Sequence, residues 1–284
     1  MTRRTLAQEI NCEGIALHAG RVVHMSLSPA PACTGIVFRR SDLDGREIVA
    51  LYDKVAETRL GTVISDGTGA SVGVVEHLLA AVVGARMDDL IVTLDGPEPP
   101  ILDGDALGYL ALLEKAGFRE TGAQRRVLVI KRRVRVESGE AWAALAPAAA
   151  LSFDFEISFA SPAIGAQHLS WVFSPENFRR DIAPARTFGF MAELDALNEM
   201  GLAKGASLDN TLAIDGDTVI NAKMMRFPDE FVRHKILDAI GDLALAGGAI
   251  VGAFEGHRSG HALNNALLRA LFADPANYEW RDAD

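Results

Sequence analysis

The same order of elements occurs twice in this chain, and that repetition limits how the chain can fold. A helix, a strand, a loop and a second helix are expected from residue 75 onwards, and again from residue 234 onwards. The first helix of each copy carries a histidine, His77 in one and His234 in the other. This order indicates two duplicated domains that face one another, with a boundary near residues 122–124.

Strand patterns surround the two copies. Residues 22–27 alternate between apolar and polar side chains, which is typical of a strand with one buried face. Runs at 127–130, 133–136 and 151–157 are rich in β-branched and aromatic residues, so we expect antiparallel strands there. Residues 249–254 should form one strand, followed by a loop at 255–260.

The second histidine helix combines an apolar stripe with a polar one. His234 and Asp238 are four residues apart and share a face, and Asp242 lies one turn further along it. Buried polar groups are costly unless something satisfies them. A neutral imidazole and a carboxylate at this spacing suit one divalent metal ion, whereas a solvated helix face is the alternative explanation. The apolar stripe consists of Phe231, Ile236, Leu237, Ile240 and Leu243.

Together the two helices supply enough ligands for a catalytic metal. If His77 meets His234 and Asp238, three protein ligands surround one ion and a fourth position stays open to water, as in catalytic zinc sites. Glu76 adjoins His77 but points elsewhere, which leaves it available as a general base. No HExxH motif is present, so the helix typical of zinc proteases is excluded.

His261 is the candidate general acid. It follows Ser259 and Gly260 at the start of a helix, where the helix dipole disfavours a cationic imidazole. To carry a proton at neutral pH, His261 needs a carboxylate that raises its pKa, and Asp242 is the candidate. Taken singly, each of these residues also has an ordinary structural explanation.

Three other features have both a structural and a functional interpretation. Residues 185–210 are rich in large apolar side chains but broken by glycines, which suits either core packing or an acyl-binding groove. The basic residues at 125–135 suit a solvated strand face. His18 and His24 lie in strand or loop patterns that need no ligand to explain them.

Composition excludes several classes of function. The net charge of −10 argues against nucleic acid as a general partner, so an anionic substrate must meet a local basic patch. Cys12 and Cys33 form no CxxC pair and no disulfide framework, which suits a reducing cytosol. We find no signal peptide after Arg3 and Arg4, and no apolar run long enough to span a membrane.

Five motifs resemble the UDP-3-O-acyl-N-acetylglucosamine deacetylases of lipid A biosynthesis. The resemblance extends from about Thr5 to Ala273, with the motifs in the family's order. Ala16, Asp105 and Ala206 depart from the family pattern, and none of them is a predicted metal ligand. The motifs are VEHLLAA at 75–81, GPEPPILDG at 96–104, ARTFGF at 185–190, HKILDAIGD at 234–242 and SGHALNN at 259–265.

The resemblance implies an α+β fold of two duplicated domains. Each would be a small, mostly antiparallel sheet packed on helices, with the helix layers facing each other and the site between them, a β-α-α-β sandwich. Residues 1–122 would form the first domain, with Glu76 and His77. Residues 123–284 would form the second, with an apolar acyl-passage insert at about 185–215.

The resemblance also implies an activity and the residues that carry it. The reaction is hydrolysis of the acetamide of UDP-3-O-[(3R)-3-hydroxyacyl]-N-acetylglucosamine to the amine and acetate, the committed step of lipid A biosynthesis. The expected protein is a cytoplasmic, monomeric hydrolase of Gram-negative bacteria that binds a small molecule, and not nucleic acid. Its implied site residues are His77, His234 and Asp238 for Zn²⁺ (or Fe²⁺), Glu76 as base, His261 as acid oriented by Asp242, Thr187 at the oxyanion, and Lys235 and Phe188 for substrate.

A second hypothesis is a binding protein for nucleotide-activated lipids that has this fold but no chemistry. It would bind the UDP-sugar without releasing acetate. The complete set of Glu76, His261 and Asp242 argues against it, because a pure binding protein has no use for a base and an acid.

Overall fold

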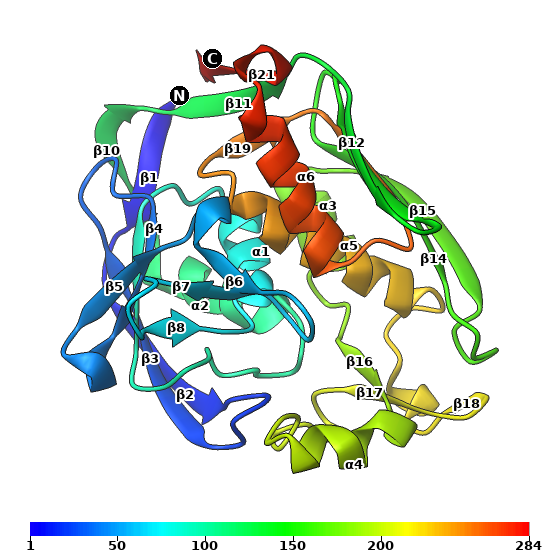
Figure 1. The fold of residues 1–284 in the computed structure, drawn as a ribbon. Helices are drawn as coiled ribbons and strands as arrows, with labels where there is room; N and C mark the ends of the chain where they lie inside the picture. The colour runs from blue at the N-terminus through cyan, green and yellow to red at the C-terminus, as the bar shows by residue number, and fades with distance from the viewer. Residues whose placement is uncertain (284) are drawn as a thin grey trace.

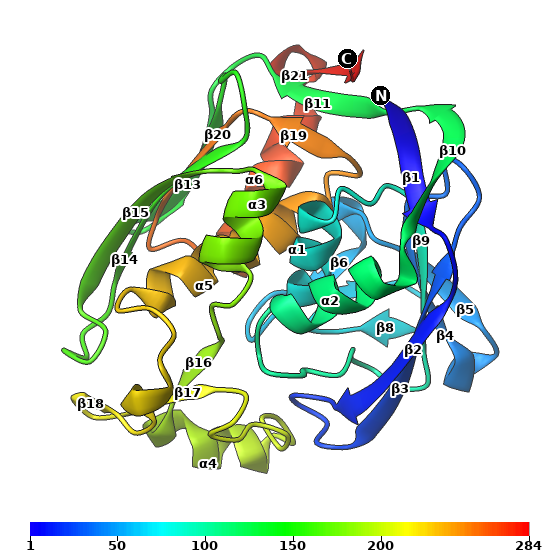
Figure 2. The same cartoon turned by 180° about the vertical axis from the view of Figure 1, so that it is seen from behind.

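The computed structural model describes residues 1–283 and places two sheets outside two layers of helices (Figure 1). Blue strands of the first half lie on one side, green strands of the second half lie on the other, and α1, α2, α5 and α6 lie between them. Figure 2 shows the same layers from behind. The predicted β-α-α-β sandwich is confirmed.

The two main sheets share one topology. In the order β2-β3-β9-β4-β5, neighbours are antiparallel except β9 and β4. The sheet β12-β13-β20-β14-β15 repeats this pattern, with its parallel pair between β20 and β14. In both halves, two hairpins precede the histidine helix, and the next strand of the sheet inserts between them. The bounds are β2 Ile10–Ile15, β3 Val22–Pro29, β4 Ile36–Arg40, β5 Arg46–Val49, β9 Leu90–Leu94, β12 Val134–Ser138, β13 Ala141–Ala146, β14 Ser152–Ser158, β15 Ala166–Val172 and β20 Ala253–His257.

The histidine helices lie at the centre of the molecule. Helix α1 (Glu76–Gly84) is buried on nearly every side, since it packs between the first sheet and helix α5 (Glu230–Ala244). The apolar run at 78–83 suits that position, because a helix that is apolar all round is stable only when it is enclosed. Helices α2 (Leu107–Ala116) and α6 (His261–Ala273) cover α1 and α5 respectively.

Smaller elements surround this framework. The insert after residue 185 carries β16, β17 and the exposed helix α4, which lie together at one end of the helix layers (Figure 1). No helix among residues 1–283 is long and apolar enough to cross a membrane. The remaining bounds are β1 Thr2–Leu6, β6 Val55–Glu57, β7 Val63–Ser65, β8 Ser71–Val72, β10 Phe118–Gln124, β11 Arg126–Ile130, α3 Pro175–Asn177, β16 Phe188–Phe190, α4 Met191–Glu199, β17 Leu212–Asp215, β18 Thr218–Val219, β19 Ala249–Val251 and β21 Tyr278–Asp282, with short helical turns at Ser41–Leu43, Tyr52–Lys54, Phe178–Ile182, Ala222–Met224 and Pro275–Asn277.

Two local predictions were wrong. Residues 249–254 are not one strand: β19 ends at Val251 and pairs with β11, whereas β20 begins at Ala253 and pairs with β13 and β14. The loop expected from Glu255 begins only after His257, because β20 continues to that residue. The predicted domain boundary between residues 122 and 123 falls inside β10 and stays a prediction.

Gly241 allows α1 and α5 to approach closely. A Cβ atom at this position would lie 2.6 Å from the backbone carbonyl carbon of Glu76 and 2.8 Å from its Cα. Real Cβ atoms do not come this close to backbone atoms, and a buried helix backbone cannot rotate out of the way as a flexible side chain can. Glycine is therefore required here for packing, although it is a poor helix former.

A buried ion pair anchors the start of the insert to α5. Arg186 Nε donates to Glu230 Oε1 over 3.0 Å, and the two side chains are 2% and 0% exposed. The same carboxylate accepts the backbone N–H of Arg186 and, at its second oxygen, that of Arg226. Glu230 thus holds both ends of the segment between residues 186 and 226.

Gly241→Ala is expected to destabilise the protein. Alanine gains roughly 1 kcal/mol over glycine in a helix, but overpacking a core typically costs about 1–3 kcal/mol, and here the clash is with backbone. The free energy of unfolding measured in denaturant should fall. Gly189→Ala is the control, because no atom lies within 4 Å of its added Cβ. Equal stability of Gly241→Ala and the native chain would contradict the close approach.

Arg186→Met is expected to lower the free energy of unfolding by about 3–5 kcal/mol, because it leaves the Glu230 carboxylate buried without its ion-pair partner. Arg39→Met is the matched control. Arg39 and Glu47 form an exposed pair, with side chains 38% and 51% exposed, and such pairs contribute about 0–1 kcal/mol. Equal losses in the two variants would refute a special role for the buried pair.

Candidate active site

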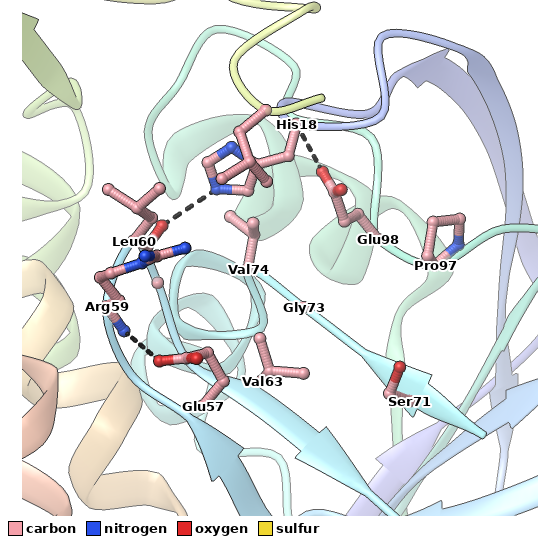
Figure 3. A pocket seen from close by; sticks show the side chains of 12 residues that line it. His18, Glu57, Arg59, Leu60, Val63, Ser71, Gly73, Val74, Pro97 and Glu98 are labelled. Carbon is pink, nitrogen blue, oxygen red and sulfur yellow. Dashed lines mark hydrogen bonds between the residues drawn. The ribbon is translucent and has the colours of Figure 1, made fainter. Parts of the chain in front are cut away.

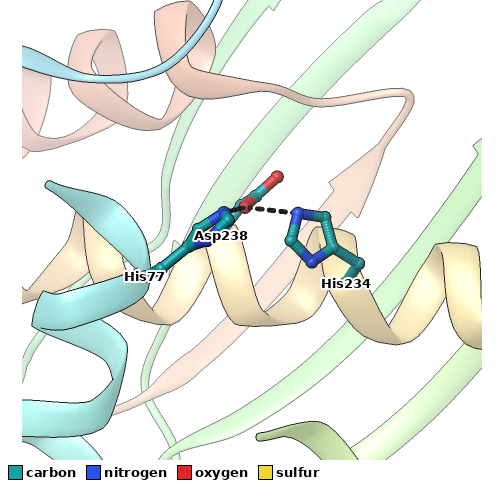
Figure 4. A group of neighbouring side chains, drawn as sticks. All are labelled: His77, His234 and Asp238. Carbon is teal, nitrogen blue, oxygen red and sulfur yellow. Dashed lines mark ion pairs between the residues drawn. The ribbon is translucent and has the colours of Figure 1, made fainter. Parts of the chain in front are cut away.

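Helices α1 and α5 bring His77, His234 and Asp238 together in the buried centre of the molecule (Figure 4). One ligand atom from each residue lies within 4.8 Å of the other two. Nε2 of His234 is 3.2 Å from Asp238 Oδ1, and Nε2 of His77 is 3.6 Å from the same oxygen. The sequence predicted this set of three residues, and the structure places all three side by side.

The surroundings of these side chains fit a divalent cation. His234 Nδ1 donates to the carbonyl oxygen of Ala185 over 3.0 Å, so its Nε2 presents a lone pair towards Asp238. Asp238 Oδ1 and His77 Nδ1 are buried and have no hydrogen-bond partner among residues 1–283. Nitrogen and oxygen acceptors that face one another in a dry interior need a cation or a proton between them. The residues present therefore suit a metal ion.

Their protonation states agree with that conclusion. Burial, with the neighbouring His234, lowers the pKa of His77 to about 3, and burial also lowers the pKa of His234. Burial acts in the opposite direction on Asp238, but His234 and Lys235 hold the pKa of this carboxyl well below its usual range. Two neutral imidazoles and one carboxylate are the forms that bind zinc or iron.

Glu76 and His261 form a second pair beside the ligands. Glu76 Oε1 lies 3.9 Å from His261 Nε2. Burial raises the pKa of Glu76 to about 7, against the opposing charge of His261. Burial alone would lower the pKa of His261, but the charges of Asp242 and Glu76 raise it to about 9. Between these values the carboxylate is ionised while the imidazole is protonated, as a base and an acid must be.

Asp242 is hydrogen-bonded to His261, and its predicted role in orienting the imidazole stays a prediction. His261 Nδ1 donates to Asp242 Oδ2 over 2.9 Å, and Asn264 Nδ2 donates to the same oxygen over 2.8 Å. Thr62 Oγ1 donates to the other oxygen, Oδ1, over 2.5 Å. We did not predict Thr62 or Asn264 as site residues. Asn264 follows His261 by three residues on one helix face, which was an available signal, whereas no local pattern marks Thr62.

The three remaining predicted residues surround this centre. Lys235 Nζ donates to Asp238 Oδ2 over 2.7 Å, so the lysine contacts a predicted ligand directly. The ring of Phe188 lies edge-on to that of His234, with centroids 6.1 Å apart. Thr187 precedes it and is held by its backbone, which donates to the Gly104 carbonyl and accepts from Leu212. Their contacts with substrate stay predictions.

A cavity of about 220 Å³ lies beside Leu60 and Val63, in the segment that leads into β7 (Figure 3). His18 borders it, donating from Nε2 to the Leu60 carbonyl, and Glu98 accepts the backbone N–H of His18. His24 lies elsewhere, on the surface, where it contacts Asp95. Neither histidine belongs to the metal-binding group.

The chain matches one family over nearly its whole length. The family model described as LpxC, UDP-3-O-acyl N-acetylglycosamine deacetylase, matches residues 3–273. Proteins named UDP-3-O-acyl-N-acetylglucosamine deacetylase from Phenylobacterium zucineum and Acidithiobacillus ferrooxidans are 47% and 45% identical to it. The first alignment covers 92% of this chain and 90% of the relative, and the second covers 99% and 93%. A Vibrio vulnificus protein of the same name is 43% identical over 98% of this chain and 92% of its own length. With its duplicated sandwich and buried His-His-Asp group, this chain belongs to the LpxC family of UDP-3-O-acyl-N-acetylglucosamine deacetylases.

Proposed function

We propose that this protein hydrolyses the acetamide of UDP-3-O-[(3R)-3-hydroxyacyl]-N-acetylglucosamine, releasing acetate and the free amine for lipid A biosynthesis. The substrate class comes from the names of its relatives. The observation that carries the proposal is the buried group of His77, His234 and Asp238 beside the pair of Glu76 and His261. Zinc is the proposed ion, and Fe²⁺ suits the same ligands.

Glu76 is the proposed general base. An ion held by His77, His234 and Asp238 would supply Lewis acidity, which polarises the acetamide carbonyl and lowers the pKa of the attacking water. Glu76 takes a proton from that water, and its pKa near 7 suits a base working at neutral pH. Its Oε1 lies 3.9 Å from Nε2 of His261, the imidazole that completes the pair.

His261 is the proposed acid and electrostatic partner. Its protonated imidazole, held by Asp242, stabilises the negative charge that develops on the carbonyl oxygen, together with the Thr187 hydroxyl. The departing amine must receive a proton, either from His261 or from Glu76 after it has deprotonated the water. Lys235 and Phe188 are the proposed substrate contacts, the former through charge and the latter through apolar contact with the acyl group.

The remaining proposals concern the domain boundaries, the acyl passage and the cellular location. We propose residues 1–122 and 123–284 as the two domains and 185–215 as the acyl passage. A cytoplasmic location agrees with two cysteines, Cys12 and Cys33, that are both free. The monomeric state and the lack of nucleic-acid binding stay predictions.

Glu76→Gln is expected to retain the metal and lose turnover, whereas His77→Ala loses both. Removing a general base typically costs about 10²- to 10⁴-fold in rate. The measurements are metal per chain by mass spectrometry and acetate released from the UDP-sugar. His168→Ala is the control, because His168 is exposed on β15 and contacts only Asp154 by ion pairing.

Each outcome bears on one assignment. Near-native kcat in Glu76→Gln would remove the base, and a full metal content in His77→Ala would remove the metal site. Binding of the UDP-sugar by the metal-loaded native protein without acetate release would support a binding protein instead.

Asp242→Asn is expected to move the alkaline limit of activity to lower pH. In the native protein the pKa of His261 is raised to about 9, so the imidazole keeps its proton below that pH and loses it above. Asparagine removes a negative charge that raises this pKa, so the proton leaves earlier. A profile of kcat/KM across neutral and alkaline pH tests this. An unchanged alkaline limb would show that Asp242 does not tune the acid.

A further inference from the structure

One residue outside the helices contacts both halves of the proposed acid–base machinery. Thr62 lies in the loop before β7, is 1% exposed, and points its hydroxyl at Asp242 Oδ1 over 2.5 Å. Its backbone N–H donates to Glu76 Oε2 over 3.0 Å. Thr62 therefore joins the base to the carboxylate that orients the acid, although Glu76 and Asp242 belong to different helices and different halves of the chain.

The hydroxyl is the sole donor to one oxygen of Asp242 among the described residues. Oδ2 receives His261 Nδ1 and Asn264 Nδ2, whereas Oδ1 receives Thr62 alone. Asp242 is 2% exposed, so bulk water cannot replace a lost donor. With donors on both oxygens, the carboxylate cannot rotate about its Cβ–Cγ bond without breaking a hydrogen bond. The orientation of the Asp242 carboxylate is thereby fixed, and with it the position of the oxygen that accepts from His261 Nδ1.

Gly61, which precedes Thr62, lies close to Oε1, the other carboxylate oxygen of Glu76. A Cβ atom on Gly61 would lie 2.9 Å from Glu76 Oε1, and the φ angle of Gly61 is +137°, which disfavours any other residue. Gly61 and Thr62 together therefore form a cradle around the Glu76 carboxylate. The small sheet β6-β7-β8 supports this cradle, because Thr62 leads directly into β7.

We propose that Thr62 is a positioning residue, which holds Asp242 through its hydroxyl and so fixes the orientation of His261 relative to Glu76. The inference rests on the proposed function. It does not require Thr62 to touch substrate or metal. Loss of the hydroxyl should therefore lower the rate of the chemical step while leaving substrate binding and metal binding intact.

Thr62→Val and Thr62→Ser separate the hydroxyl from the volume of the side chain. Valine keeps the shape and the N–H to Glu76, and serine keeps the hydroxyl. Displacing a catalytic group by about 1 Å can lower the rate about 100-fold, so a smaller displacement of His261 should cost about 10- to 100-fold. We expect kcat to fall by about that factor in Thr62→Val, with KM and metal content unchanged, and to recover most of its native value in Thr62→Ser. Thr68→Val is the matched control, since Thr68 donates to Asp66 on the surface.

A second readout needs no turnover. In protein labelled with ¹⁵N-histidine, the Nδ1 proton of His261 should give a protected, downfield resonance because it is held by Asp242. We expect this resonance in the native chain, Thr62→Ser and Thr68→Val, and its loss or broadening in Thr62→Val. If the native protein releases no acetate, the proposed function fails, while this resonance still tests the Thr62–Asp242–His261 connection.

Three outcomes would overturn the inference. One is native kcat together with an unchanged His261 resonance in Thr62→Val. Another is equal loss of kcat in Thr62→Ser and Thr62→Val, which would assign the effect to packing. The third is a change in KM or metal content alone. Should Thr62→Val not fold, Thr62→Ala provides the same loss of hydroxyl without added bulk, and the same outcomes apply to it.

Discussion

Helices α1 and α5 come into close contact at Gly241, and the positions of Glu76 and His77 relative to His234 and Asp238 depend on this contact. The missing side chain lets the backbone of Glu76 lie directly against α5, so that His77 faces His234 and Asp238 across the contact. His261 reaches the same place because α6 packs on α5. The duplicated halves thus meet through their histidine helices, and the site forms at the contact itself and not in a surface loop.

This arrangement concentrates polar groups where water is excluded, and the fold compensates with specific partners. His234 donates to the Ala185 carbonyl, and the adjacent Arg186 is tied to Glu230 at the start of α5. Asp242 has a donor on each oxygen. Asp238 Oδ1 faces Nε2 of both His77 and His234 and is buried without a hydrogen-bond partner in the described chain, and a cation would provide the missing interaction. Burial raises the pKa of Glu76 to about 7, whereas the charges of Asp242 and Glu76 raise the pKa of His261 to about 9 against the effect of burial, so the carboxylate can be ionised while the imidazole is protonated.

Much of this was predictable because helical spacing is a local property. One stripe of α5 carries His234, Asp238 and Asp242 whatever the tertiary arrangement, because residues four apart share a helix face. The repeated order of elements indicated that a second histidine helix faces this stripe. Strand limits were less predictable. Residues 249–254 look continuous in apolar character, but the chain leaves one sheet and enters another at Gly252, where a Cβ would meet Ile130 and Ala146. That change depends on which neighbours are present.

The sequence by itself determined the two histidine helices, the residue types that suit a metal ion and, through five long motifs, the family. Only the tertiary structure decided that Thr62 joins Glu76 to Asp242, that Asn264 shares Asp242 with His261, and that Lys235 contacts Asp238. The reason is physical. Helix faces follow from residue spacing, which a sequence displays. Contacts between residues 180 positions apart, such as Thr62 and Asp242, arise from packing and leave no periodic pattern in the chain.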